Sequence, residues 1–285
     1  MLTASAIDTA VRRGLEEDAP WGDLTSELLI PASAQAQASL SAREPGILSG
    51  SAVFAAAMTA KDSAVTVRFL IQEGAPFCRG DTLAQLSGAA RSILCAERVA
   101  LNFIQRMSAI ATETSRYVEE VSGTHARIVD TRKTTPGLRA LERHAVLCGG
   151  GHNHRYSLSD AVLAKDNHLA VLTAQGLSVT AALLELRSRL SHTTHLEVEV
   201  DRMEQIEPVL AAGIDTIMLD NFTIDELRAG VKLVAGRALV EASGNVSIET
   251  VRAIADTGVE IISVGALTHS VRAIDLGLDI DVTAP

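Results

Sequence analysis

The sequence predicts an α/β protein whose second half builds either a parallel sheet or a closed barrel. After Gly123, short apolar segments alternate with amphipathic helical segments, as they do in repeated βα units. The last four short segments end 20, 22 and 22 residues apart, which is an ordinary spacing for such units. Polar residues also gather where the short segments end. In a parallel sheet those ends share one edge, so they are a natural place for a site.

The first hundred residues have a different pattern of apolar and polar residues from the rest of the chain. We expect a short amphipathic helix within the first 20 residues, and turns in the segment EGAPFCRGD. Alternating apolar residues predict half-buried strands between residues 36 and 88, most clearly at Val65, Val67, Phe69 and Ile71. A long helical pattern then begins near Arg91, with apolar residues three and four apart, and ends at Gly123.

Strands are expected in the second half at residues 126–130, 161–165, 196–200, 216–220, 238–242 and 260–264. Each is almost continuously apolar, which is typical of a sheet covered on both faces. The helical segments that follow the later strands end at glycine, and Thr223 with Glu226 has the spacing of a capping box.

Composition excludes several classes of protein. The chain is 47% hydrophobic and 21% charged, as in an ordinary globular protein, and its net charge of −10 argues against nonspecific binding to nucleic acid or to an anionic membrane. No apolar run is long enough to span a bilayer, and the N-terminus lacks the apolar core of a cleavable signal. The odd number of cysteines, with no close pair, predicts free thiols and a cytoplasmic location.

Positive charge is concentrated in one window of this acidic chain. Residues 127–165 contain seven Lys/Arg and three Asp/Glu, whereas the rest of the chain contains 18 and 32. Aromatic residues make up only 3% of the chain, so a pocket for a small polyanion is favoured over a nucleic-acid groove. The candidate anion-binding residues are Arg132, Lys133, His154, Arg155 and Lys165. Solvated salt bridges to Glu142, Asp160 and Asp166 are the alternative.

Carboxylates occupy the ends of two successive predicted strands. Glu199 and Asp220 would face the mouth of a barrel, where they suit Mg²⁺ shared with a substrate phosphate, or hydrogen bonds to sugar hydroxyls. Alternatively, Glu197 and Glu199 lie on one face of their strand and are simply polar residues of a barrel interior. Glu241 with Ser243 ends the next strand.

Two glycine-containing loops are candidates for binding a phosphate. Ser243–Gly244–Asn245 and the segment that begins with Gly265 and Ala266 each precede a predicted helix, whose first N–H groups attract anions. His152 and His154 lack the spacing of a zinc protease, which disfavours a metal site there. Lys165 at a strand end would also suit a Schiff-base lysine of an aldolase.

Several segments, in consistent order along nearly the whole chain, resemble the quinolinate phosphoribosyltransferase family: EEDAPWGDLTSELLIP, AERVALNF, DTRKTTPGLR, GGGHNHRYSLSDAVLAKDNH, EVEVD, MLDNF, ASGNV and VGALTHSVRAIDLGLDI. A related protein encoded with molybdate transporters is similar, but the GALTHS segment looks like the quinolinate enzyme. Ala109 stands where the family usually has glycine, a departure that bears on helix packing more than on chemistry.

The resemblance implies an N-terminal α/β sandwich, residues 1–110, followed by an incomplete α/β barrel, residues 111–285, whose last residues pack back on the first domain. It implies homodimers, or larger assemblies of dimers, with sites completed by the neighbouring subunit through Arg98. Arg98, Arg132, His154 and Arg155 would hold the carboxylates of quinolinate, and Lys133 and Lys165 would lie near the pyrophosphate. Glu199 and Asp220 would hold the ribose hydroxyls and Mg²⁺, and the Ser243–Asn245 and Gly265–Ala266 loops would hold the 5-phosphate.

The activity implied by the resemblance is transfer of phosphoribosyl from phosphoribosyl pyrophosphate to quinolinate, with decarboxylation, in NAD biosynthesis. Two alternatives remain open from the residues alone. One is a phosphosugar lyase or aldolase that uses Lys165. The other is an inactive homologue that serves as an anion-binding module.

Overall fold

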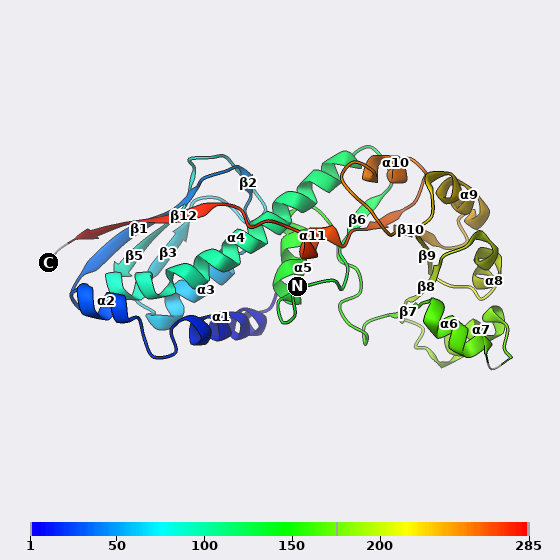
Figure 1. Cartoon of the computed structure of the whole chain (residues 1–285), viewed down its shortest axis with the longest axis horizontal. Coiled ribbons are helices and arrows are strands. Elements are labelled where there is room, and N and C mark those ends of the chain that lie inside the picture. Colours follow the sequence, from blue (N-terminus) through cyan, green and yellow to red (C-terminus); the bar gives the residue numbers. More distant parts are fainter. Residues whose placement is uncertain (1, 175, 284–285) are drawn as a thin grey trace. The chain divides into compact units, whose positions relative to one another are not determined.

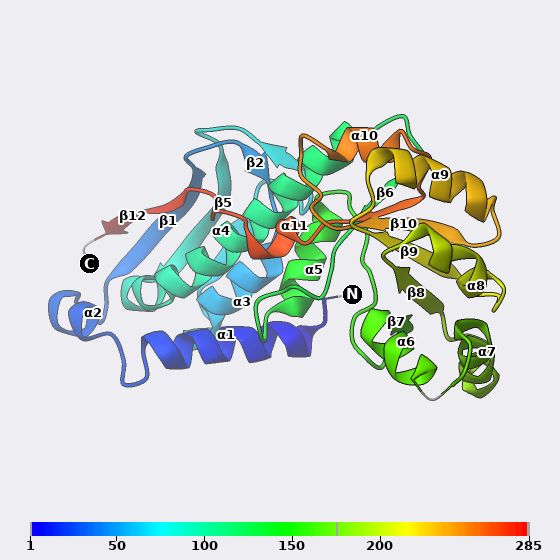
Figure 2. The ribbon, with the colours of Figure 1, turned by 45° about the vertical axis from the view of Figure 1, so that its right-hand side comes forward.

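The structure, a computed structural model, describes residues 2–174 and 176–283, which form two compact units (Figures 1 and 2). Within these residues the first unit comprises 2–115, 134–150 and 267–283, and the second comprises 116–133 and 151–266 except residue 175. The expected fold class is confirmed: an antiparallel sheet with helices in one unit, and a six-stranded parallel sheet in the other.

The first unit is built on a four-stranded antiparallel sheet in the order β12-β1-β5-β3. Its strands are β1 (Gln35–Ala42), β3 (Thr66–Phe69), β5 (Thr82–Ala89) and β12 (Leu276–Thr283). Alternate residues of β1, from Ala36 to Ala42, are buried, while those between them are more exposed. The sheet therefore turns one face to the core, and β12 brings the end of the described chain back to pair with β1 along its whole length.

Helices fill the core of the first unit. They are α1 (Ala4–Asp18), α2 (Leu24–Leu29), α3 (Ser51–Lys61), the first part of α4 (Ala90–Glu120) and α5 (Arg139–Cys148), and short strands β2 (Gly46–Ile47) and β4 (Pro76–Phe77) pair beside them. An ion pair between Arg106 and the buried Glu142 ties separate segments of the first unit together. Glu142, which is 1% exposed, accepts from Arg106 at 2.8 Å, and Arg106 also donates to the backbone oxygen of Thr268.

The second unit contains six parallel strands in the order β6-β11-β10-β9-β8-β7. These are β6 (Arg127–Val129), β7 (Val162–Ala164), β8 (Leu196–Val200), β9 (Thr216–Asp220), β10 (Leu239–Ser243) and β11 (Ile261–Ser263), all six close to the predicted positions. The first strand pairs with the last, and the others follow in chain order. This is the order of strands around a barrel, left open between β6 and β7.

The two faces of this sheet differ in chemistry. Val198, Ile217, Val240 and Ile262 alternate with the cavity-lining positions and are buried, consistent with packing under the surrounding helices. These helices are α6 (Asp166–Thr173), α7 (Val179–Arg189), η1 (Met203–Gln205), α8 (Ile206–Leu210), α9 (Ile224–Val234) and α10 (Val251–Ala255). The register aligns Glu199, Met218 and Glu241 across three neighbouring strands on the inner face. Polar side chains thus collect inside the barrel.

Most local predictions hold, with a few differences. The capping box of Thr223 and Glu226 is present at the start of α9. The predicted turn EGAPFCRGD contains the two-residue strand β4, and Val65 and Ile71 fall just outside β3. In the described part of the chain, no helix combines the length and the apolar character needed to cross a bilayer.

Candidate functional site

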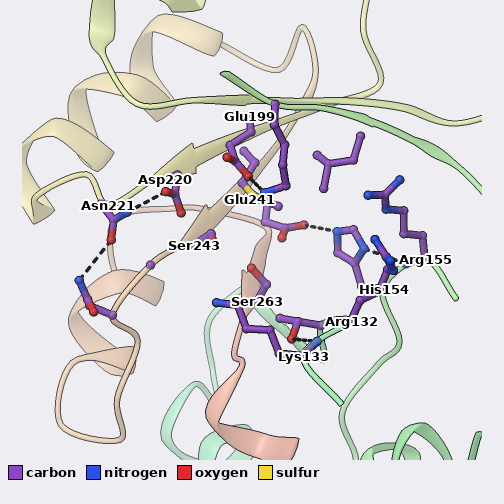
Figure 3. Close-up of a pocket in the computed structure, with 16 residues that line it drawn as sticks. Arg132, Lys133, His154, Arg155, Glu199, Asp220, Asn221, Glu241, Ser243 and Ser263 are labelled. Atoms are coloured by element: carbon purple, nitrogen blue, oxygen red, sulfur yellow. Dashed lines mark hydrogen bonds and ion pairs between the residues drawn. The ribbon is translucent and has the colours of Figure 1, made fainter. Parts of the chain in front are cut away.

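A cavity of about 520 Å³ opens at the carboxyl ends of the parallel strands of the second unit (Figure 3). Such a volume is ordinary for a small-molecule site. Ten of the residues singled out in the sequence line it: Arg132, Lys133, His154, Arg155, Lys165, Glu199, Asp220, Ser243, Gly244 and Asn245. Most of them follow or end a strand, and the alternation of β8, β9 and β10 turns their inward-facing positions to the cavity, whereas His154 and Arg155 lie in the segment that follows the bridge of His152 to Val129.

Cationic side chains occupy one side of the cavity. Figure 3 shows Arg132, Lys133, His154 and Arg155 grouped opposite Asp220 and Asn221. Burial and the charge of Arg132 both lower the pKa of Arg155, so the two guanidinium groups lie close enough to repel. Arg132 Nε is buried and has no hydrogen-bond partner within residues 2–174 and 176–283. A bound anion would relieve the repulsion and satisfy this donor.

A buried aspartate holds this cationic group in place. Asp130, fully buried just after β6, accepts from the backbone N–H of His154 at 2.7 Å and from Asn153 Nδ2 at 2.8 Å. His152 forms a single parallel bridge to Val129, so the returning chain lies along the free edge of β6. This brings residues 152–155 beside residues 131–133, although 18 residues separate the two stretches in sequence.

The imidazole of His154 contacts two glutamates of the barrel interior. Its Nε2 lies 3.1 Å from Glu197 Oε2 and 3.6 Å from Glu241 Oε2. Burial opposes its charge, but the hydrogen bond to Glu197 and the charges of Glu241, Glu197 and Asp130 outweigh this and raise the pKa of His154. Burial and the charge of Glu197 in turn raise the pKa of Glu241 to about 8. Burial beside Glu197 therefore favours the protonated form of Glu241 at neutral pH, and the raised pKa of His154 favours its charged form.

Lys165 and Glu199 form an ion pair at the rim, with Lys165 following β7 and Glu199 near the end of β8. A paired ammonium is a poor nucleophile. This arrangement therefore does not favour the hypothesis that Lys165 forms a Schiff base as in an aldolase. The alternative that Glu197 and Glu199 are polar residues of the barrel interior fits Glu197, which is buried. Glu199 instead lines the cavity.

The opposite side of the cavity is a loop cluster around Asp220. Asn221 donates to Asp220 Oδ2 at 2.7 Å and accepts from Asn245 Nδ2 at 3.2 Å. Gly244 has φ 94°, and a Cβ there would lie 2.2 Å from Asn221 Oδ1, so only glycine allows this approach. Asp220 is thereby tied to the Ser243–Asn245 loop.

Some predicted residues lie elsewhere. Arg98 is exposed on α4 in the first unit, and Gly265 and Ala266 are not among the residues that line the cavity. The helix expected after the Ser243–Asn245 loop is present, but α10 begins only at Val251 and is five residues long. A turn, residues 247–250, intervenes and accounts for the difference.

Comparison with known proteins identifies the family. The family model for the C-terminal domain of quinolinate phosphoribosyl transferase matches residues 110–279, and that for the N-terminal domain matches residues 23–108. The chain belongs to the quinolinate phosphoribosyltransferase family. The resemblance seen in the sequence is thus confirmed.

Individual members of the quinolinate phosphoribosyltransferase family are similar along the whole chain. The nicotinate-nucleotide pyrophosphorylase (carboxylating) of Mycobacterium leprae is 41% identical, over 98% of this chain and 100% of that protein. A probable enzyme of the same name from Bacillus subtilis is 39% identical, over 94% of this chain and 91% of that protein. The crystal structure of NadC from Streptococcus pyogenes is 37% identical, covers 100% of this chain and 99% of its own, and has a TM-score of 0.94.

Several residues in and around this cavity were not among those singled out from the sequence. Asn221 follows Asp220 in the segment MLDNF, so its place after a strand end was an available signal. Ser263 occupies the inward phase near the end of β11 and could have been found in the same way. The roles of Asp130 and of the Glu197–Glu241 pair had no such signal, since they depend on which strands become neighbours.

The shared proton predicts that glutamine is tolerated at either glutamate but not at both. Glu197→Gln or Glu241→Gln keeps one negative charge beside His154, whereas the double variant removes it. We therefore expect the pKa of His154 to stay raised in each single variant and to fall in the double variant. An NMR titration of the histidine signals measures this, with exposed His192 as the internal reference. A double variant whose His154 titrates like the parent protein would contradict the pairing.

The pH dependence of the unfolding free energy should reflect the raised pKa of Glu241. The folded-state pKa of Glu241 is above its ordinary value, so its protonated form contributes stability that is full below about pH 4.5 and is lost as pH rises through about 8. Glu241→Gln removes that loss. Relative to the variant, the parent protein should lose on the order of 1 kcal/mol of unfolding free energy per pH unit in this window.

Proposed function

We propose that this protein transfers the phosphoribosyl group of phosphoribosyl pyrophosphate to quinolinate and decarboxylates the product. The products are nicotinate mononucleotide, CO₂ and pyrophosphate, and the reaction belongs to NAD biosynthesis. The observation that carries the proposal is the two-sided cavity. Crowded cations around Arg132 and Arg155 suit a dicarboxylate, and Asp220 with its amide-rich loop suits a phosphorylated sugar.

The cationic side does most of the positioning. Bringing two polyanions together is repulsive, and Arg132, Arg155 and the imidazolium of His154 offset that repulsion in a partly buried site. In the proposed complex they hold the carboxylates of quinolinate, so that the pyridine nitrogen points at C1 of the ribose. Fixing this geometry removes much of the entropic cost of a bimolecular step.

The bond changes follow from that placement. The pyridine nitrogen forms a bond to C1 as the bond from C1 to pyrophosphate breaks, and positive charge develops on the sugar. Lys133 and Lys165 line the cavity, and in the proposed complex they would stabilise the departing pyrophosphate. The ribosylated ring nitrogen is then positive, and its charge stabilises the electron pair that stays on C2 when the C2–carboxylate bond breaks and CO₂ leaves. C2 finally gains a proton, and no organic cofactor is required.

We further propose Mg²⁺ as the metal that accompanies phosphoribosyl pyrophosphate. Glu199 and Asp220 supply the hard oxygen donors that Mg²⁺ prefers, and both line the cavity. When bound, the ion would neutralise charge on the leaving pyrophosphate. Asn221 holds Asp220 by a hydrogen bond and so orients its carboxylate.

Arg98 and the assembly form another part of the proposal. Arg98 is exposed on α4, and family resemblance assigns it to the site of a neighbouring subunit. We therefore propose a homodimer, or an assembly of dimers, with shared sites. We also propose a cytoplasmic location, because Cys78, Cys95 and Cys148 are all free; fractionation of the producing cells tests this.

The decisive assay measures pyrophosphate release with quinolinate or with nicotinate as acceptor. Nicotinate lacks the second carboxylate, so a site built for a diacid should use it at least about a hundredfold less well, a difference of about 3 kcal/mol. Comparable rates would reject the assignment of quinolinate. Quinolinate binding without turnover would instead support the inactive binding module.

Arg132→Ala should raise the KM for quinolinate or abolish turnover. Loss of one desolvated charge-assisted partner costs roughly 2–5 kcal/mol in kcat/KM. Arg127→Ala is a matched control, since Arg127 is exposed at the opposite end of β6. Steady-state kinetics with both variants checks this, and parent-like kinetics for Arg132→Ala would remove it from the site.

Asp220→Asn should impair use of phosphoribosyl pyrophosphate more than binding of quinolinate. The change removes a charge expected to hold the ribose and Mg²⁺, and we expect a rise of at least about tenfold in the KM for the donor. Asp225→Asn, on the exposed first turn of α9, is the control. Equal losses for both substrates would contradict the assignment.

Shared sites predict complementation between two inactive variants. Arg98→Ala and Lys165→Ala should each be nearly inactive alone. After mixing and subunit exchange, half of the dimers are hybrids with one intact site of two, so about a quarter of the activity should return. If the mixture stays inactive while exchange is shown by mass spectrometry, Arg98 does not act across subunits.

A further inference from the structure

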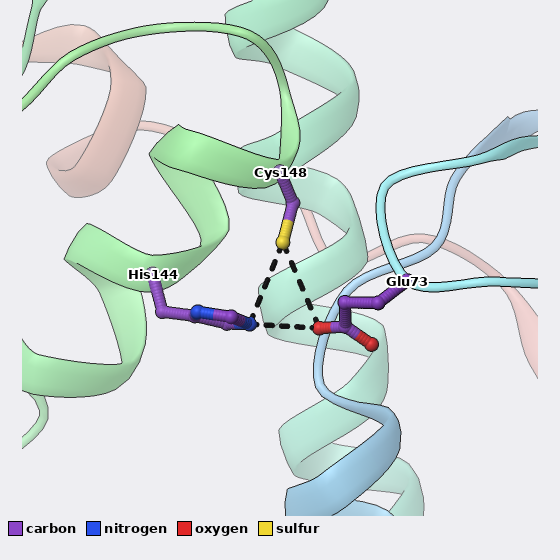
Figure 4. Close-up of side chains that lie close together, drawn as sticks. All are labelled: Glu73, His144 and Cys148. Carbon is purple, nitrogen blue, oxygen red and sulfur yellow. Dashed lines mark hydrogen bonds and ion pairs between the residues drawn. The ribbon is translucent and has the colours of Figure 1, made fainter. Parts of the chain in front are cut away.

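A second cluster of reactive side chains lies in the first unit and has no role in the reaction above. His144 and Cys148 lie four residues apart on α5 and so share a face of the helix. Glu73, from the loop between β3 and β4, meets them there (Figure 4). All three are partly exposed, and the side chains of His144 and Glu73 are 27% and 28% accessible.

The three ligand atoms form a compact triangle. Cys148 Sγ lies 3.5 Å from His144 Nε2 and 3.6 Å from Glu73 Oε1, and His144 Nε2 lies 2.9 Å from Glu73 Oε1. Tetrahedral Zn²⁺, with bonds of about 2.3 Å to sulfur and about 2.1 Å to nitrogen or oxygen, separates its ligand atoms by roughly 3.4–3.6 Å. Two sides of the triangle already have this length, and the third needs to open by about half an ångström.

Hydrogen bonds from backbone N–H groups and from a hydroxyl fix the orientation of the Glu73 carboxylate. Its Oε1 accepts from the N–H of Gly50 at 2.7 Å, and its Oε2 accepts from the N–H of Ser51 at 3.0 Å and from the Ser51 hydroxyl. Ligating carboxylates in metal sites are commonly held by such outer hydrogen bonds. Burial opposes the charge of Glu73, but hydrogen bonds from His144, Ser51 and Gly50 lower its pKa to about 2, and hydrogen bonds to Cys148 and Glu73 raise the pKa of His144 to about 9. Metal binding would therefore displace the proton of this ion pair.

The loop that carries Glu73 is also fixed against the end of α5. Gly74 has φ 79°, and a Cβ there would approach the backbone oxygen of Cys148 to 3.4 Å. Its N–H donates to the backbone oxygen of Leu48 at 2.8 Å, beside the pairing of β2 with β4. The ligands therefore come from two elements that already pack closely, and little ordering would accompany binding.

We propose that Glu73, His144 and Cys148 form a binding site for a divalent transition metal of the zinc type. A thiolate, an imidazole and one carboxylate are a donor set for Zn²⁺ and not for Mg²⁺, which prefers oxygen. With three protein ligands at a partly exposed position, the fourth position is left for water or a small ligand. The metal would join α5 to the loop 70–75 and, through Gly50 and Ser51, to the start of α3.

The test uses the full-length, untagged, reduced protein and Co²⁺ as a spectroscopic substitute for Zn²⁺. One equivalent should produce a thiolate-to-cobalt charge-transfer band and the visible bands of tetrahedral cobalt, and Zn²⁺ should displace both. Cys148→Ser should abolish the charge-transfer band, whereas Cys78→Ser, which changes an exposed thiol outside the cluster, should keep it. Loss of a direct ligand should weaken Zn²⁺ binding at least as much as loss of an outer partner, about 10–100-fold.

His144→Gln gives an independent check should Cys148→Ser fold poorly, and Ser51→Ala should weaken binding by about tenfold through Glu73. The proposal is overturned if the parent protein shows no charge-transfer band, or if the band survives Cys148→Ser. Binding that persists without sulfur ligation would place the metal outside this cluster and would equally contradict the proposal. Turnover with quinolinate should be unchanged in His144→Gln, so failure of this site leaves the proposed reaction untouched.

Discussion

The arrangement of the cavity depends on one buried carboxylate, Asp130. The chain leaves β6, contributes residues 134–150 to the other unit, and returns at residue 151. Asp130 holds this returning segment, because its carboxylate accepts hydrogen bonds from the backbone N–H of His154 and from the side chain of Asn153. A buried charge without such donors would be costly, so the carboxylate and the returning segment stabilise each other. The result is that two cationic stretches become neighbours on the rim of the barrel.

The sequence could predict the residues that depend on strand periodicity. Lys165, Glu199, Asp220 and Ser243 follow or end strands, and parallel strands bring such positions to one edge whatever their order. The sequence could not predict that Glu197 and Glu241 approach the same imidazole, because β8 and β10 are separated by β9 in the sheet. That meeting needs the curvature of the barrel, which no local pattern encodes. Likewise Asn221 reaches the Ser243–Asn245 loop only because Gly244 lacks a side chain.

The glutamates inside the barrel give His154 a defined charge. Two ionised carboxylates at this depth would repel strongly, and two neutral ones would leave the imidazolium without a counter-charge. One shared proton is the state in which both costs are smallest. His154 lines the cavity with Nε2 turned to the glutamates and Nδ1 accepting from the N–H of Arg155, so the barrel interior fixes the position of this ring beside the cationic residues.

The side chains around His154 differ from those around His144 in exposure and in donor type. His154 is 12% accessible, its Nε2 faces the carboxylates of Glu197 and Glu241, and its Nδ1 accepts from the N–H of Arg155; the carboxylates raise its pKa. His144 is 27% accessible and meets a carboxylate kept ionised by backbone donors, together with a thiol. Sulfur adds affinity for a softer metal, and exposure leaves room for its fourth ligand. Without a metal, hydrogen bonds to Cys148 and Glu73 raise the pKa of His144 to about 9, so a metal at this cluster would take the place of that proton.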